Sequence, residues 1–406
     1  MENLNSYLRK LNALNITPKG DKRVYITKAQ GRILSEDIVC KIAIPRFDNS
    51  AMDGYAIRLN KNKPYESYAI KGDIFAGDSK NYALKDNEAF YIATGARVPK
   101  NCDCVIQKEL IEIKDNALFL RAIPAKNQCI KLRGEDFKKG EILLKRGKIL
   151  DSSDIGILAM QGISKVSVRK KVKIIIFGSG DEVARLDTPL KNNQIYDINS
   201  HFIRANFRHL NCKITYGDII KDNAKALEST LKNALKKYDI IITSGGVSVG
   251  ERDYIHRILQ SLKAEILADS INIKPGRPVV LSTLQDKFIL NLPGNPIGAF
   301  LQSYFCLSIL VAKFSDLNHK IAESPLKSLE IPNGADFKIS KNTTHIILGN
   351  IKDDAFFAFN NAKYQGAQIA PLLKSSVFAV IENFSDKSCV KKGEKVRIFP
   401  IKPKFY

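Results

Sequence analysis

The sequence lacks any run of about 18 or more uncharged apolar residues, the length that a helix needs to cross a membrane. Its first residues, MENLNSYLRKLNALN, form an amphipathic pattern without the apolar segment of a secretory signal. We therefore expect no membrane-spanning segment and no membrane partner.

Cysteine is sparse, and its spacing is irregular. The seven cysteines are odd in number and scattered, which indicates reduced thiols and a cytoplasmic protein rather than a disulfide framework. Cys102-x-Cys104 has no second pair, so a zinc site is not expected. No cysteine stands in a pattern that indicates a covalent nucleophile.

The formal net charge is +22, yet the sequence lacks the Arg-and-aromatic cluster that is typical of a nucleic-acid surface. The positive residues are mostly Lys and are spread along the chain. We expect a solvated Lys-rich surface and no nucleic-acid partner. The positive field would still attract small anions such as oxyanions or nucleotides.

The densest motif is Tyr238–Tyr254, with the sequence YDIIITSGGVSVGERDY. Ile240–Ile242 predicts a strand that is buried on both faces, and a Gly/Ser loop and a helix start follow it. Glycines let a ligand approach the backbone, whose free N–H groups and helix dipole favour anionic oxygen. The loop has neither Walker nor Rossmann spacing, and a plain tight turn is the alternative.

Two further strands end in turns of the same kind. Val172–Phe177 leads into GSGDE, and Phe288–Leu292 leads into PGNP and an apolar helix over Ile297–Val311. Helical patterns cover Asn199–Leu210 and Asp222–Lys237. The three strand ends predict a doubly wound parallel sheet, whose ligands lie outside the carboxyl ends of the strands.

Several polar stretches are candidates for binding or for ordinary structural roles. Ile44–Arg58 (IPRFDNSAMDGYAIR) is rich in Asp, Asn and Ser, but local side-chain-to-backbone bonds in a turn are the alternative. Asp222 and Asp253 stand at helix starts, where the alternative role is an N-cap. Lys274 and Arg277 flank a Pro-Gly turn and could clamp a phosphate or an oxyanion.

At 406 residues and 44% hydrophobic content the chain is expected to form several domains. Residues 1–44 predict two helices, the second opened by a capping box at Thr27–Gln30. Residues 65–135 and the tail alternate as strands do, and Ser152–Met160 predicts a helix. The expected fold class is multidomain α/β, with a central doubly wound three-layer α/β domain, an all-β insert domain, a helical linker domain and a C-terminal β-domain. The predicted bounds are 1–44 with 140–171 (helical linker), 45–139 (β insert), 172–320 (central α/β) and 321–406 (C-terminal, β-barrel-like).

Eight motifs follow one another in a fixed order: FDNSAMDGYA, ATGARVP, RGED, GSGDE, QIYDIN, TSGGVSVGERDY, IKPGRP and LPGNP. In this order they resemble the molybdopterin molybdenumtransferase family, the bacterial MoeA type that also forms the E-domain of gephyrin. The resemblance covers essentially the whole chain. It implies magnesium-dependent transfer of molybdenum from molybdate to adenylylated molybdopterin, with release of AMP. It also implies an elongated homodimer whose site lies between the central domain of one subunit and the β insert of the other. Other molybdenum cofactor biosynthesis proteins would be its further partners.

The resemblance also implies a set of site residues. The catalytic set would be Asp53, Asp136, Glu182 and Lys274, and the magnesium ligands Asp222 and Asp253. Asp53 and Asp136 could position water, or take a proton if burial beside other carboxylates raises their pKa. Lys274 and Arg277 would attract molybdate. The pterin nucleotide would be bound by Thr94, Ser244, Gly245, Gly246, Ser248, Arg277, Pro293, Gly294, Asn295 and Pro296.

The chain departs from the family pattern in two places. Ser179 stands where the family usually has Thr before Gly-Asp-Glu, which keeps the hydroxyl. Ala367 and Gln368 replace the Ser and Gly of a Gln-x-Ser-Gly pattern, so the C-terminal domain is left out of the expected site.

Two other functions remain as alternatives. The related molybdopterin adenylyltransferase shares the central fold, but that hypothesis leaves residues 1–165 unexplained. A gephyrin-like scaffold is the second, although no linker or fused domain is evident in this chain.

Overall fold

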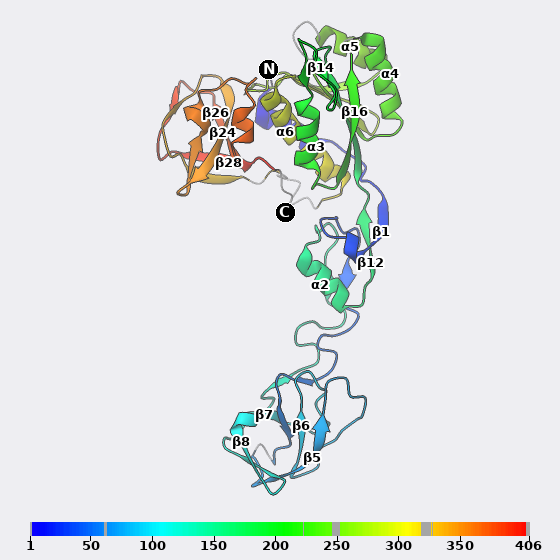
Figure 1. The fold of residues 1–406 in the computed structure, drawn as a ribbon, viewed down its shortest axis with the longest axis vertical. Coiled ribbons are helices and arrows are strands. Elements are labelled where there is room, and N and C mark those ends of the chain that lie inside the picture. The colour runs from blue at the N-terminus through cyan, green and yellow to red at the C-terminus, as the bar shows by residue number, and fades with distance from the viewer. Residues whose placement is uncertain are drawn as a thin grey trace. The chain divides into compact units, whose positions relative to one another are not determined.

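The computed structural model describes residues 2–60, 63–221, 223–245, 252–317, 326 and 328–402, apart from the side chains of residues 252 and 253. The chain divides into two compact units, drawn in Figure 1. Unit 1 comprises Met1–Glu36, Arg146–Gly156 and Ser164–Tyr406, and unit 2 comprises Asp37–Lys145 and Ile157–Ile163.

A six-stranded sheet forms the centre of unit 1, in the order β16-β13-β17-β21-β20-β18. Its first four strands are parallel, and Ile241 pairs with Ile175 on one side and Ile289 on the other. These β-branched residues are buried, as the isoleucine runs predicted. The strands are β13 (Val172–Ser179), β16 (Cys212–Ile220), β17 (Ile240–Ser244), β18 (Glu265–Asp269), β20 (Val280–Leu284) and β21 (Lys287–Leu292).

Helices cover both faces of this sheet because side chains alternate along each strand. Ile174 and Ile176 belong to a core with α1, α3 and α6, whereas Ile175 and Phe177 belong to a core with α4 and α5. The predicted three-layer, doubly wound arrangement is therefore confirmed. The helices are α1 (Leu4–Ala13), α3 (Ile198–Phe207), α4 (Ala224–Leu235), α5 (Arg252–Ser261) and α6 (Pro296–Phe314).

The far edge of the sheet is antiparallel, which the sequence had not indicated. β20 and β21 are joined by a two-residue turn at Gln285 and Asp286, with Gln285 at φ +56°, and β18 pairs with β20 in antiparallel register. A turn this short can connect only antiparallel neighbours. The parallel part of the sheet thus ends at β21.

A second six-stranded sheet lies beside α6 (Figure 1); five of its strands follow the order β19-β24-β26-β28-β22, and the sixth, β25, pairs with β24. Its inner residues Leu348 and Phe378 belong to the same core cluster as α6, so the C-terminal sheet shares a core with the central layers. The elements are β19 (Ile273–Lys274), β22 (Leu329–Pro332), β23 (Phe337–Lys338), β24 (Thr343–Lys352), β25 (Ala355–Ala358), a 3₁₀ turn at Phe359–Ala362, α8 (Ala370–Leu373), β26 (Val377–Asn383), β27 (Cys389–Val390) and β28 (Lys395–Pro400).

The helix predicted to open at Thr27 is wrong. Only a 3₁₀ turn forms at Ile26–Lys28, and Gly31 follows at φ +72°, a conformation that ends a helix. The next residues are extended, with Ile33 bridged to Ile149 and Leu34 to Val168. The elements around this stretch are β1 (Asp21–Tyr25), which pairs with β12 (Lys165–Arg169), and α2 (Ser152–Met160), which has the predicted bounds.

Unit 2 is built on a six-stranded sheet in the order β7-β4-β6-β5-β9-β8. Small cores cover it on both sides, one around Ile57 and Tyr68 and the other around Ile74 and Ile92. The predicted all-β character of the insert is confirmed. The elements are β2 (Ile38–Val39), β3 (Asn49–Ser50), β4 (Gly54–Ile57), β5 (Tyr68–Ile74), β6 (Glu88–Ile92), β7 (Cys104–Gln107), a 3₁₀ turn at Lys108–Leu110, β8 (Ile111–Lys114), β9 (Ala117–Leu120), β10 (Ile130–Lys131) and β11 (Ile142–Leu144).

α6 is long and apolar enough to cross a membrane by length and composition alone. However, 94% of its most apolar window is buried inside the structure. Its apolar surface is therefore used to form the core of unit 1.

Replacing Phe378 by Ala should destabilise unit 1. The Phe378 ring is fully buried. It makes edge contacts with three α6 rings, Phe300, Tyr304 and Phe305, and stacks on Phe399 of β28. Truncating a buried Phe costs about 3–5 kcal/mol, so chemical denaturation should show a loss of this order. Phe384→Ala is the control, since Phe384 is 52% exposed and its loss should change stability by less than about 0.5 kcal/mol. Equal effects of the two changes would contradict the shared core.

Candidate functional site

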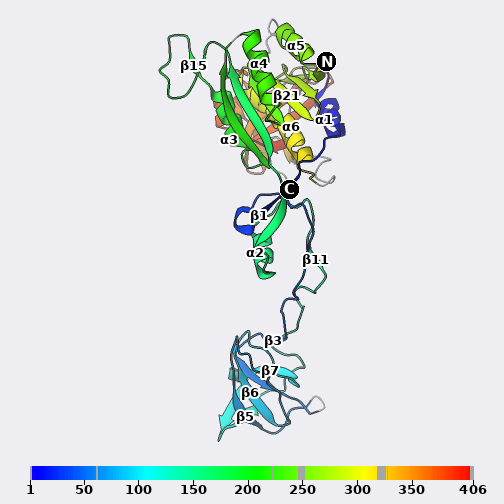
Figure 2. The same ribbon diagram turned by 90° about the vertical axis from the view of Figure 1, so that its right-hand side faces the viewer.

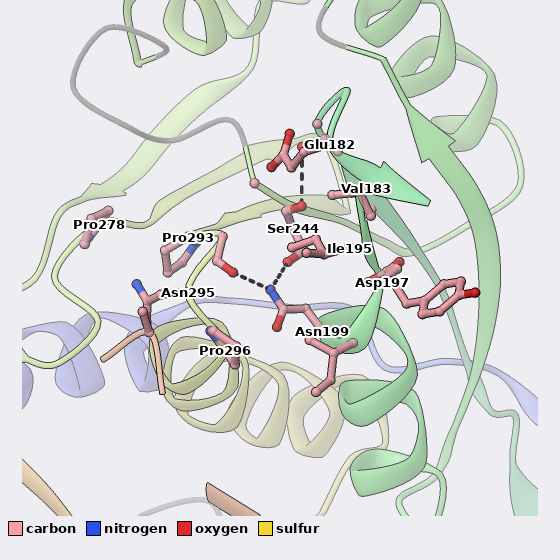
Figure 3. A pocket seen from close by; sticks show the side chains of 18 residues that line it. Glu182, Val183, Ile195, Asp197, Asn199, Ser244, Pro278, Pro293, Asn295 and Pro296 are labelled. Carbon is pink, nitrogen blue, oxygen red and sulfur yellow. Dashed lines mark hydrogen bonds between the residues drawn. The ribbon is translucent and has the colours of Figure 1, made fainter. Parts of the chain in front are cut away.

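A cavity of about 580 Å³ lies at the carboxyl ends of β13, β17 and β21 (Figure 3). All three Gly-bearing turns that the sequence singled out contribute to it. Seven predicted site residues line this one cavity: Glu182, Ser244, Gly245, Pro293, Gly294, Asn295 and Pro296. The other lining residues are Gly178, Ser179, Gly180, Val183, Ile195, Tyr196, Asp197, Ile198, Asn199, Pro278 and Ala367.

Asn199, in the first turn of α3, ties two of the turns together. Its Nδ2 donates to Ser244 Oγ at 2.9 Å and to the Gly294 carbonyl at 2.8 Å, as the dashed lines in Figure 3 show. These bonds fix the end of β17 relative to the end of β21. Because the Gly294 carbonyl can only accept, the amide nitrogen of Asn199 must face it.

Gly245 stands where β17 meets β13 at the cavity wall. Its φ is +113°, and a Cβ there would lie 2.6 Å from the Ser179 carbonyl oxygen. Both facts require glycine at this position. The close approach also brings the TSGG and GSGDE turns together, and Ser179 Oγ donates to the Ser244 carbonyl at 3.3 Å.

The α6 N-terminus and the C-terminal domain close another side of the cavity. Asn295 caps α6, its Oδ1 accepting from Gly298 N at 2.7 Å. A Cβ on Gly366 would lie 3.2 Å from Pro275 and 3.6 Å from Asn295 Oδ1, so the YQGAQ loop lies against the PGNP turn. This loop places Ala367 in the cavity wall, although the sequence analysis had left the C-terminal domain out of the site.

The wall of the cavity is acidic in spite of the net charge of +22. Glu182 and Asp197 are its charged side chains, and the lining residues that the structure describes include no Lys, Arg or His. Lys274 and Arg277 are exposed and do not line the cavity; Lys274 belongs to β19, which pairs with β24 of the C-terminal sheet. The two predicted oxyanion-binding cations are therefore not part of the cavity lining, although Pro278, the neighbour of Arg277, is.

In unit 2, three motifs that are distant in sequence come together. Ser50 of FDNSAMDGYA exchanges backbone hydrogen bonds with Gly95 and Ala96 of ATGARVP. Asp48 Oδ1 accepts from the backbone N–H of Arg133, in RGED, at 2.7 Å. Asp136, in the same motif, is exposed, and its backbone N–H donates to Ile44 O.

Asp53 and Thr94 are joined directly. Asp53 Oδ1 accepts from both the backbone N–H and the Oγ1 of Thr94, each at 2.8 Å. These two bonds, with help from the positive charge of Lys108, lower the pKa of Asp53 below its ordinary value. Asp53 is exposed in the single chain, so the rise in pKa that burial beside other carboxylates would cause does not occur there.

Some predicted residues lie outside the part of the chain that the structure describes. These are Asp222, Gly246, Ser248 and the side chain of Asp253. The structure does identify the N-cap of α4, which is Asn223, with its Oδ1 accepting from Ala226 N at 3.1 Å. The capping role considered for Asp222 therefore belongs to its neighbour. Among the described residues, no group of three or more His, Cys, Asp or Glu side chains is placed to hold a metal ion.

Two protein-family models match this chain. Residues 2–162 match the family described as MoeA N-terminal region (domain I and II), and residues 175–309 match the probable molybdopterin binding domain. A molybdopterin molybdenumtransferase of Haemophilus influenzae is 30% identical over 391 residues, 94% of each chain. The chain belongs to the molybdopterin molybdenumtransferase family.

Two more relatives of this family extend the comparison. A molybdopterin molybdenumtransferase of a Nostoc species is 33% identical over 75% of this chain and 72% of its own. The crystal structure of a molybdopterin biosynthesis MoeA protein from Pyrococcus horikoshii superposes with a TM-score of 0.83 at 25% identity. It covers 98% of this chain and 99% of that one. The predicted family and fold class are confirmed.

Sequence reasoning missed Asp197 and Asn199 as cavity residues. Both belong to QIYDIN, which was noted among the motifs but interpreted only as the lead into a helix. Their position in the sequence could have indicated them. Two polar residues at the start of a helix that begins at the edge of a ligand cavity can point toward the ligand. Asp197 is the N-cap of α3, its Oδ1 accepting from Ser200 N at 3.0 Å.

Replacing Thr94 by Val should raise the pKa of Asp53 toward its ordinary value, since the change removes the Oγ1 donor and keeps the backbone N–H. A depressed folded-state pKa stabilises the fold above the unfolded-state pKa, and this stabilisation is lost as the pH falls through the folded-state pKa. The Thr94→Val protein should therefore lose less stability than the parent over that acidic interval.

The measurement is a pH titration of the Asp53 carboxyl carbon by NMR with labelled aspartate. Asp78 serves as a control in the same spectra, because its pKa is lowered by Tyr82 and the backbone at Lys80 instead. An Asp53 midpoint identical to that of the parent would contradict the assigned role of the Thr94 hydroxyl.

Proposed function

We propose that this chain transfers molybdenum from molybdate to adenylylated molybdopterin and releases AMP. The observation that carries the proposal is the cavity in which the TSGG, GSGDE and PGNP turns meet at the carboxyl ends of parallel strands. Strand ends of this kind bind nucleotide-like ligands in doubly wound sheets. The names of the relatives and of the matched molybdopterin-binding domain support the same substrate class.

Each group of predicted site residues would have a separate role in this reaction. Backbone N–H groups of the glycine turns would bind the phosphates of the pterin nucleotide. Asp53, kept ionised by Thr94, would accept a hydrogen bond and orient water, with Asp136 as a second carboxylate. Lys274 and Arg277 would attract molybdate from solution by their charge.

Magnesium would be held by Asp222 and Asp253. Since Asn223 caps α4, the carboxylate of Asp222 is not needed for that role, and Asp253 belongs to the first turn of α5. Two carboxylates with phosphate oxygens are a ligand set that Mg²⁺ prefers. When bound, the ion would neutralise charge on the phosphoanhydride that is cleaved.

The first experiment is to incubate the pure protein with adenylylated molybdopterin, molybdate and magnesium and to measure AMP. Release of AMP that requires molybdate supports the proposal. Consumption of ATP with plain molybdopterin would instead identify an adenylyltransferase. Absence of both activities in a folded protein that binds partner proteins would favour a scaffold.

Asp222→Asn should abolish most magnesium-dependent AMP release and leave the melting temperature unchanged, because it removes a charge that a hard cation needs. Asp222→Ala should behave in the same way, since Asn223 and not Asp222 is the cap. The control is Asn223→Ala, which should cost about 0.5–2 kcal/mol of stability and keep activity. Normal turnover of the Asp222→Asn protein at limiting magnesium would show that Asp222 is not a magnesium ligand.

We also propose a homodimer in which Asp53 of one subunit and Asp253 of the other serve one active site. The family resemblance and the division of the acidic motifs between unit 2 and unit 1 support this arrangement. Mixing inactive Asp53→Ala with inactive Asp253→Ala should restore part of the activity, because each heterodimer would keep one intact site. If labelled subunits exchange and activity stays at zero, the shared site is wrong.

The cytoplasm is the compartment that we propose for this reaction, with other molybdenum cofactor biosynthesis proteins as partners for product transfer. All seven cysteines are free thiols, and four are buried, which agrees with a reducing environment.

A further inference from the structure

Three buried polar atoms without hydrogen-bond partners lie around the start of α3. They are Asp197 Oδ2, the Nε2 of His201 and the hydroxyl of Tyr216, and none has a partner of ordinary hydrogen-bond geometry within the described residues. Such atoms are uncommon in folded proteins because each carries the cost of its lost hydration. A group of them beside a cavity therefore requires an explanation.

Asp197 is the member of this group that lines the cavity. Its side chain is almost completely buried, with 5% relative exposure. One carboxylate oxygen is already used, since Oδ1 caps α3 through Ser200 N. The other oxygen lies against the cavity wall at Gly178, where a Cβ would come within 2.6 Å of it.

Tyr216 lies near the Asp197 carboxylate but does not fully satisfy it. Burial and the Asp197 and Asp218 carboxylates raise the pKa of Tyr216 to about 12, with a smaller contribution from a weak hydrogen bond to Asp197. This contact lacks the geometry of an ordinary hydrogen bond. The ring is held by His201, whose imidazole lies over it at 4.8 Å between centroids. Asp197 Oδ2 is thus left as a charged acceptor beside the cavity.

Asn199, the second residue of α3, provides a second acceptor. Both amide hydrogens of Asn199 are used by Ser244 Oγ and the Gly294 carbonyl, so its Oδ1 remains to accept from a ligand (Figure 3). Asp197 and Asn199 therefore present acceptor atoms, while the described lining offers no cationic side chain. A ligand part that is complementary to this wall must supply hydrogen-bond donors.

We propose that Asp197, with Asn199 beside it, binds the donor edge of the pterin ring, namely the ring N–H and the 2-amino group of its 2-amino-4-oxopyrimidine half. Asp197 Oδ2 and Asn199 Oδ1 each offer one acceptor to these N–H donors, and hydrogen bonds to a buried charge are about twice as strong as neutral ones. The proposal rests on the proposed function, because it assigns to this wall the heterocycle of the same substrate. The phosphates would then lie toward the TSGG and PGNP turns, away from Asp197 and Glu182.

The test compares two small fluorescent probes on the full chain. One is 2-amino-4-oxopteridine, and the other is 2,4-dioxopteridine, in which a carbonyl oxygen replaces the amino group. The parent should bind the amino compound roughly 10- to 100-fold more tightly, as expected for one hydrogen bond to a buried charge. Equal affinity for the two probes, or no binding of either, would overturn the proposal.

Asp197→Asn should reduce this preference to within about threefold, because the charge is lost while the α3 cap is kept, Asn being as good a cap as Asp. The matched control is Asp218→Asn. Asp218 also raises the pKa of Tyr216, but it is exposed, pairs with Arg185 at 3.1 Å and does not line the cavity. The Asp218→Asn protein should bind the amino compound more tightly than the dioxo compound by the same factor as the parent. An Asp197→Asn protein that keeps the full preference would show that Oδ2 binds only water.

The outcome is separable from that of the proposed function. If the parent releases AMP but Asp197→Asn keeps the probe preference, the transferase assignment stands and the pterin assignment fails. If no AMP is released but the preference depends on Asp197, the cavity binds pterins and the transferase assignment fails.

Discussion

The burial of α6 on all sides is the constraint on which unit 1 depends. The helix contacts α1, α3, the central sheet and the C-terminal sheet through a single apolar core. Near its start, a Cβ on Gly298 would lie 2.9 Å from Gly276 Cα, and Gln302 Nε2 donates to Gly276 O at 2.6 Å. Because these contacts fix the α6 N-terminus, they also fix the PGNP turn at one wall of the cavity.

The packing around α6 also brings the C-terminal domain to the cavity. This domain contributes Ala367 to the cavity wall, and Ala367 has no hydroxyl. Phe378 holds the C-terminal sheet against α6, and the YQGAQ loop is thereby brought against Asn295. The absence of a hydroxyl at Ala367 leaves this part of the wall apolar. The polar contacts available to a ligand are therefore concentrated on the strand-end turns and on the α3 N-terminus.

Much of the fold could be predicted from the sequence, because isoleucine runs and glycine turns are local signals. The strands β13, β17 and β21 and the helix α2 follow from such patterns. The antiparallel edge was missed because the two-residue turn at Gln285 and Asp286 contains no glycine, the residue that usually marks such a hairpin in a sequence. The second predicted helix had a capping signal at Thr27. It does not form because Gly31 has a left-handed φ and the residues after it pair with distant parts of the chain. Seven cavity residues were identified from their motifs, whereas Asp197 and Asn199 were not, because their neighbours in space come from three other strand ends.

The contrast between the charge of the chain and the charge of its cavity has a physical consequence. A net charge of +22 attracts a polyanionic substrate over distances of about a Debye length, some 8–10 Å at ordinary ionic strength. At contact, however, the described cavity lining offers Glu182, Asp197 and neutral groups, and no cationic side chain of this lining is available to a phosphate. The positive charge of the whole chain therefore attracts anions at a distance, whereas the cavity lining determines which ligand binds. A cationic wall would bind any phosphate, whereas an acceptor wall beside glycine turns selects for a ligand that is anionic at one end and rich in N–H donors at the other.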